Sequence, residues 1–240
     1  MTVTSGPGRP RHTGPLRPGS GGREQILDAA AELFTTHGFA TTSTRAIAEA
    51  VGIRQASLYH HFATKDDILD ALLQSTVIPV IPVADALLRG PATTAEQAAA
   101  RLYALALHDG TQLCEAPWNV GVLYLAPELR RPRFVPFQSA RERLRRCYVA
   151  AGEALVAHTG GPPHAGSLAF RLVESLVNLR ADGLATPDSP RQVAEGCVHI
   201  ARWPGDVAAA GAALLREVVL PDATPPDATP DLAAAMTRDR

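Results

Sequence analysis

The chain has 240 residues, enough for one large domain or for a small domain joined to a larger one. Hydrophobic residues make up 46% and aromatic residues only 5%, a composition that favours helices packed through small side chains over a large β-sheet core. The formal net charge of −1 excludes a global basic field, so any nucleic-acid site must be local.

Cysteine usage and hydropathy further narrow the class of protein. Cys114, Cys147 and Cys197 are odd in number and far apart, which argues against a disulfide framework and against a zinc site. The N-terminus lacks the apolar segment of a secretory signal, and the most apolar stretch, 77–88, is too short to span a bilayer. We therefore expect a soluble, cytoplasmic protein with no membrane partner, metal or cofactor.

Helical periodicity dominates the chain between two ends rich in Pro and Gly, and no run of alternating residues predicts a strand. Residues 1–22 carry Arg9, Arg11 and Arg17 without an acid, which predicts a disordered basic arm. Its PGRPR segment weakly resembles arms that enter the DNA minor groove, and disorder without function remains the alternative. Residues 221–240 repeat PDATP and predict a disordered tail. The expected helices cover 23–37, 43–52, 55–62, 65–78, 94–109, 117–126, 136–158, 165–183, 190–202 and 206–219.

The segment STRAIAEAVGIRQASLYHHF, residues 43–62, joins two short helices through a glycine. Ser43 is a good N-cap, Ala48 is small where two helices would cross, and Gly52 can take the positive φ of a tight turn. This succession is typical of a helix-turn-helix, whose second helix enters the DNA major groove.

The second of these helices separates its apolar and polar residues. At 100° per residue, Leu58 and Phe62 share one face, which we expect to be buried. Gln55 on the opposite arc can pair with adenine through both amide atoms, Ala56 leaves room for a thymine methyl, and Ser57 both donates and accepts. Donors suited to phosphate are expected on Tyr59, His60, Thr44, Arg45 and Lys65.

The longer segment TTSTRAIAEAVGIRQASLYHHFATKDDIL resembles the DNA-binding domain of the TetR family of transcriptional repressors, with LY-x-HF followed by a spaced lysine. The resemblance runs from residue 23 to about residue 72. It implies an all-α protein, with a three-helix helix-turn-helix DNA-binding domain at 23–70 and a larger helical ligand-binding and dimerisation domain at 71–220. The DNA-contacting positions that it implies are Thr44, Arg45, Arg54, Gln55, Ala56, Ser57, Tyr59, His60 and Lys65. Many members have a small polar residue in place of Arg54, which leaves the preferred operator open.

The body beyond residue 71 offers ring-bearing and isolated polar side chains within an aliphatic background. Such a set predicts a site for a small, mostly apolar ligand, although core packing remains the alternative for each residue. The ligand-binding candidates are Tyr103, His108, Trp118, Tyr124, Phe137 and Asn178. Glu174, four residues before Asn178, could bond a ligand, a symmetry-related helix or Asn178 itself. The arginines of 130–146 alternate with acids and predict a solvated surface.

The resemblance implies a repressor that binds a palindromic double-stranded operator as a homodimer and is released by a small-molecule inducer. Such dimers hold their reading helices about 34–36 Å apart, and we expect helices 165–183 and 206–219 to pair with their symmetry mates. No G-x-S-x-G, P-loop, H-E-x-x-H or dinucleotide-binding loop occurs, and His108 and Cys114 do not share a helical face, so we expect no enzyme. A helical protein-interaction regulator, or an activator not released by ligand, remains the alternative.

Overall fold

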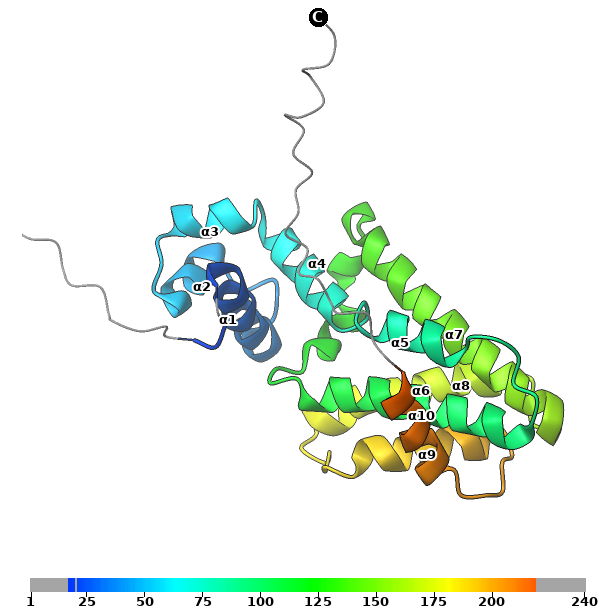
Figure 1. Ribbon diagram of the computed structural model, residues 1–240. Helices are drawn as coiled ribbons and strands as arrows, with labels where there is room; N and C mark the ends of the chain where they lie inside the picture. Colours follow the sequence, from blue (N-terminus) through cyan, green and yellow to red (C-terminus); the bar gives the residue numbers. More distant parts are fainter. Residues whose placement is uncertain (1–16, 20, 219–240) are drawn as a thin grey trace, which may run out of the picture.

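The computed structural model describes residues 17–19 and 21–218, and within these ranges all regular structure is helical. The predicted tail and residues 1–16 and 20 of the predicted arm lie outside the described residues. Figure 1 shows a small group of three helices joined through a fourth to a larger helical body. The predicted all-α fold class is confirmed.

The small group consists of α1 (Gly22–His37), α2 (Thr44–Val51) and α3 (Gln55–His61), and α4 (Lys65–Ser75) leads from it into the body. The body contains α5 (Val80–Leu87), α6 (Ala95–Glu115), α7 (Val135–Thr159), α8 (Ala165–Ala181), α9 (Ser189–Ile200) and α10 (Ala208–Glu217). Three short 3₁₀ helices separate α6 from α7: η1 (Val120–Leu125), η2 (Pro127–Arg130) and η3 (Pro132–Phe134).

Local side chains fix the helix ends of the small group. Ser43 caps α2 by accepting a hydrogen bond from the Ala46 N–H at 3.1 Å, as the sequence predicts. Gly52 closes α2 with φ 76° and ψ 27°, a left-handed conformation that costs glycine little. At α4, Thr64 and Asp67 cap each other's backbone N–H in a capping box.

The body is assembled around α6, which packs against α7, α8, α9 and α10. Close helix crossings depend on glycine. A Cβ added at Gly152 of α7 would lie 2.4 Å from the Gly166 Cα of α8, and one added at Gly211 of α10 would lie 2.4 Å from the Tyr103 ring. These helices are therefore in backbone or near-backbone contact, which larger residues would prevent.

Three elements differ most from the prediction. Helix α5 was not expected because Pro79 and Pro82 suggested a break, but both prolines fall at its start, where the missing N–H is not needed. Helix α6 continues to Glu115, past Gly110, which packs against Leu176. The predicted helix at 117–126 is instead the 3₁₀ helix η1.

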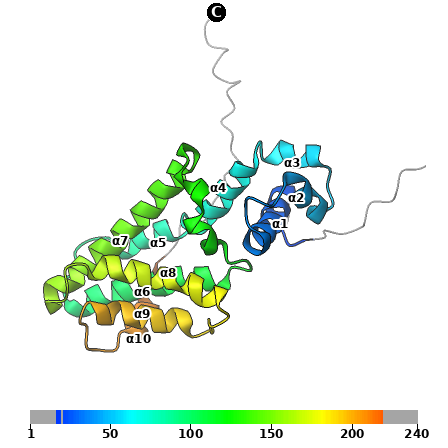
Figure 2. The same cartoon turned by 180° about the vertical axis from the view of Figure 1, so that it is seen from behind.

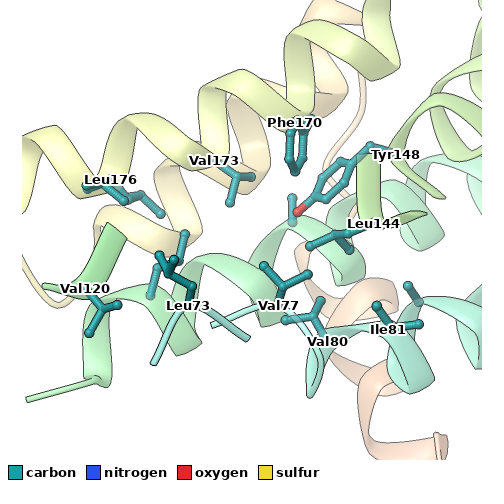
Figure 3. Close-up of a cluster of buried hydrophobic side chains, with 14 of the residues drawn as sticks. Leu73, Val77, Val80, Ile81, Val120, Leu144, Tyr148, Phe170, Val173 and Leu176 are labelled. Atoms are coloured by element: carbon teal, nitrogen blue, oxygen red, sulfur yellow. The ribbon is translucent and has the colours of Figure 1, made fainter. Parts of the chain in front are cut away.

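The α4–α5 region is apolar for a structural reason. By length and composition, Lys65–Leu87 could cross a membrane, yet 56% of its apolar window is buried inside the protein. Leu69, Leu73 and Val80 are fully buried there. Figure 3 shows side chains of α4 and α5 packed against those of η1, α7 and α8. A core helix of a folded domain accounts for this composition.

Candidate nucleic-acid interface

The exposure of α3 follows the pattern that its sequence predicts. Leu58 is fully buried and Phe62 is 5% exposed, so this face joins the core of the three-helix group. The other arc is accessible to solvent. Ser57 is half-buried, and the exposed residues are Arg54, Gln55, Ala56, Tyr59 and His60. Gln55 and His60 are thus displayed on the protein surface, as recognition of a duplex requires.

The turn before α3 sets the angle between the two helices. The Gly52 N–H donates to the carbonyls of Ala48 and Glu49, and the Ile53 N–H donates to the Ala48 carbonyl at 3.0 Å. Ala48 is 2% exposed and Ile53 is half-buried against the core. The small residue and the left-handed glycine therefore bring α3 across α2 in a helix-turn-helix.

A polar network holds the Gln55 amide in place. Gln55 Nε2 donates to Thr44 Oγ1 at 2.9 Å and to the Tyr59 hydroxyl at 3.4 Å, and that hydroxyl is 3.1 Å from Thr44 Oγ1. The bond to Tyr59 is the longer of the two, so once it opens, one N–H and the amide oxygen can turn to a base. Those two groups are what a bidentate pair with adenine uses.

Arg45 stands beside this network at the start of α2. Its Nε donates to Glu49 Oε1 at 2.8 Å, and both side chains are more than half exposed. An exposed ion pair of this kind contributes little to stability, so a phosphate can compete for the guanidinium.

Lys65 occupies a different place from the one expected of a phosphate contact. Its Nζ donates to the carbonyls of Phe39 at 2.7 Å and Thr42 at 2.8 Å, and it lies 4.2 Å from the centre of the Phe39 ring. Burial lowers the pKa of this ammonium. Lys65 thus ties the start of α4 to the loop between α1 and α2, and we expect this structural role in place of the phosphate contact, which the geometry does not test.

Arg17 also departs from its prediction as part of a disordered arm. It donates to Asp28 at 2.9 Å and Glu32 at 2.6 Å on α1, and to the Ala50 carbonyl of α2 at 3.0 Å. Its side chain is only 16% exposed. Arg17 thereby fastens α1 to α2, whereas Arg9 and Arg11 lie outside the described residues.

The six predicted ligand-binding residues do not converge on one cavity. Tyr124 and Phe137 do meet, with ring centres 5.7 Å apart. Tyr103 packs against α10, His108 is half-buried on α6, and Asn178 is exposed. Trp118 lies at the boundary with the small group, where its Nε1 donates to Asp28 Oδ1 at 2.8 Å.

The arginines of 130–146 are mostly exposed, as expected of a solvated surface, and four of them also join separate elements. Arg131 of the η2–η3 turn donates to Asp66 of α4 at 2.7 Å, and Arg133 of η3 pairs with Asp67 of α4. Arg141 of α7 bonds Glu174 of α8, so Glu174 is not directed at Asn178. The pairs made by Arg131 and Arg133 connect the body to α4, the helix that leads to the DNA-binding group.

A buried acid escaped the sequence-based prediction. Asp109 of α6 is 4% exposed and accepts a hydrogen bond of 2.8 Å from the Tyr148 hydroxyl of α7. Burial raises the pKa of Asp109 to about 7, opposed in part by the Tyr148 bond. Figure 3 shows Tyr148 among the surrounding apolar side chains. The sequence feature that could have indicated this buried acid is its position as a lone acid on a mostly apolar stretch of α6.

Fold and interface together define a helix-turn-helix transcriptional regulator. The family model described as bacterial regulatory proteins, tetR family, matches residues 26–72, from the first turn of α1 into α4. AmtR of Mycobacterium smegmatis, known from a crystal structure, is 52% identical, with a TM-score of 0.78 over 85% of this chain and 97% of that one. The chain belongs to the TetR family.

Curated relatives are similar mainly in the DNA-binding group. The transcriptional repressor KstR2 of Rhodococcus jostii is 47% identical over 55 residues, which span 23% of this chain and 27% of that protein. The chain thus matches about a quarter of the length of such relatives. The structure of KstR2 from Mycobacterium tuberculosis, a ketosteroid transcriptional regulator, shares the fold with a TM-score of 0.59 at 24% identity, over 77% of this chain and 94% of that one.

Proposed function

We propose that the chain is a cytoplasmic, homodimeric repressor that binds a palindromic operator and is released from it by a small-molecule inducer. In this proposal residues 23–70 read the DNA, residues 71–220 bind the inducer and dimerise, and the terminal segments 1–22 and 221–240 flank them. The observation that supports DNA reading most directly is the arc of α3 that is exposed opposite the buried Leu58.

The DNA-contacting residues divide by chemistry. Gln55, held by Thr44 and Tyr59, reads an adenine, and its neighbours Ala56 and Ser57 lie on the same exposed arc. Phosphates are bound by the flanking donors, since phosphate contacts orient a reader without specifying sequence. The phosphate-contacting set is Thr44, Arg45, Arg54, Tyr59 and His60. Lys65 contributes indirectly by fixing the loop before α2.

The ligand response is supported by contacts that hold both ends of α4. Near its start, Asp66 is bonded by Arg131. At its end, Thr76 Oγ1 lies 2.6 Å from the Tyr124 hydroxyl of η1. A rearrangement in the body therefore reaches α4, and through it α3. The small, mostly apolar inducer is inferred from the ring-bearing residues of the body, of which Tyr124 and Phe137 meet.

Dimerisation through helices 165–183 and 206–219 stays a prediction, and the packing of the body favours a second candidate pair. Helix α10 packs on α6, whereas α9 packs on both α6 and α8. Seen from behind in Figure 2, α8 and α9 lie side by side. Leu168, 49% exposed on α8, is an apolar side chain on that surface. We therefore propose the pairing of α8 and α9 as a candidate dimer interface beside the expected pairing of α8 and 206–219.

The test is binding to DNA that flanks the protein's own gene, measured by fluorescence anisotropy. Gln55→Ala is expected to weaken operator binding by about 1–3 kcal/mol and to relax the preference for one base. Gln97→Ala, at the distant start of α6, is the matched control. Equal affinities of wild type and Gln55→Ala on the best sequence found would reject α3 as the reading element.

A further inference from the structure

A small cavity lies where the ends of α4 and α6 meet η1. Its volume is about 80 Å³, and its wall includes Thr76, Gln112, Trp118, Asn119 and Arg180. Since a water molecule takes about 30 Å³ in the liquid, the space suits two or three waters or one molecule of about four heavy atoms. The cavity is far smaller than a drug-sized pocket.

Two amide oxygens on the wall have no donor within the described protein. Asn119 Nδ2 donates to the Val177 carbonyl at 2.8 Å, and Gln112 Nε2 donates to the Ser75 carbonyl at 3.4 Å. These bonds fix which side of each amide carries the oxygen. Asn119 Oδ1 and Gln112 Oε1 are both buried and accept no hydrogen bond from the protein. Buried acceptors without a hydrogen bond are rare unless a bound molecule supplies the donor.

The principal donors on the wall are already used. Arg180 donates to the carbonyls of Leu113 and Ala116 at the end of α6, and the Trp118 N–H is bonded to Asp28. The cavity therefore accepts hydrogen bonds more readily than it donates them. The guanidinium of Arg180 disfavours a cation, and the two amide oxygens disfavour an anion.

We propose that this cavity binds a small uncharged molecule with a primary amide or urea-type NH₂ group, whose two hydrogens reach Gln112 Oε1 and Asn119 Oδ1. Trp118, on the same wall, joins the site to Asp28 of α1, so the occupant also adjusts the contact between body and DNA-binding group. The site itself is independent of the proposed function, on which only its regulatory effect rests.

Acetamide and acetone are matched probes, because both have four heavy atoms and only acetamide carries N–H donors. Trp118 is the reporter once Trp203, the other tryptophan, is replaced in a Trp203→Phe background. Trp203 Nε1 is itself buried without a partner, so this replacement removes an unsatisfied donor. Acetamide is expected to change the fluorescence with saturation in the range of about 0.1–10 mM, and acetone to bind about tenfold more weakly.

Variants identify the acceptor. Gln112→Met, similar in shape but without the oxygen, is expected to weaken acetamide binding about tenfold. Gln97→Met makes the same change on the same helix about 22 Å away, and is expected to leave acetamide binding unchanged. Thermal melts verify that both variants fold, and saturation-transfer NMR on the acetamide methyl group gives a readout independent of tryptophan.

Three results would overturn the proposal and mean that the cavity holds solvent alone. These are acetamide binding that does not saturate, acetamide binding no tighter than acetone binding, and equal acetamide binding by wild type and Gln112→Met. The regulatory effect is measured as the operator dissociation constant with and without saturating acetamide, and a several-fold change is expected. An unchanged constant overturns that effect. Absence of operator binding in the probe-free protein would count against the proposed function instead.

Discussion

The buried Asp109 makes a specific prediction about pH. Its pKa rises from 3.8 to about 7, which corresponds to about 4 kcal/mol at 1.36 kcal/mol per unit. Because the folded-state pKa lies above the unfolded value, the folded state holds a proton that the unfolded chain has released between about pH 4 and pH 7. Stability from this group is therefore complete below about pH 4, falls as pH rises, and levels off above about pH 7.

Asp109→Asn isolates the effect, because the amide oxygen can still accept the Tyr148 hydrogen bond but does not titrate. Denaturant unfolding is measured from about pH 4.5 to 8 at one protein concentration, since the proposed dimerisation would contribute to stability. The free energy of unfolding of wild type, relative to Asp109→Asn, is expected to fall by up to about 1.4 kcal/mol per pH unit below pH 7. Asp182→Asn, at an exposed acid, is the control. Parallel curves for wild type and Asp109→Asn would refute the reasoning.

Lys65→Met is expected to lower the free energy of unfolding by about 1–3 kcal/mol while leaving the salt dependence of operator binding unchanged, because the ammonium serves backbone carbonyls; a normal melt with a shallower salt slope would restore its role as a phosphate contact. Trp118→Phe removes the N–H to Asp28 together with part of the ring and is expected to change operator affinity several-fold, measured by anisotropy; unchanged affinity would leave that bond without a role in coupling. Gly152→Ala is expected to cost about 1–3 kcal/mol in a melt, against an unaffected Glu153→Ala, since the new Cβ would meet Gly166; equal melting temperatures would contradict the close crossing.

The reading helix could be predicted because its determinants are local. Gly52 and the spacing of Leu58 and Phe62 are sufficient to indicate the turn and the buried face. Lys65 could not be placed in the same way, since its partners Phe39 and Thr42 lie 26 and 23 residues earlier. In the sequence, a basic residue at a helix start has the same appearance whether its side chain binds a phosphate or a backbone carbonyl.

The body was less predictable for the same reason. Trp118 and Asp28 are 90 residues apart, and nothing in either neighbourhood announces their bond. Residue types suggested a ligand set, but helical rotation and loop path decide where a side chain points. As a result Asn178 is exposed while Tyr124 is packed beside Phe137.

The clamping of α4 at both ends has a mechanical consequence. Its 11 residues form a rod of about 16 Å, at 1.5 Å per residue. If the Tyr124 end stays fixed and the rod tilts by about 10°, the Lys65 end travels about 3 Å, close to the 3.4 Å rise along the duplex axis between successive phosphates of one strand. In a two-fold assembly the other subunit makes the symmetry-related movement. A small tilt of α4 therefore suffices to move the two reading helices out of register with the major groove.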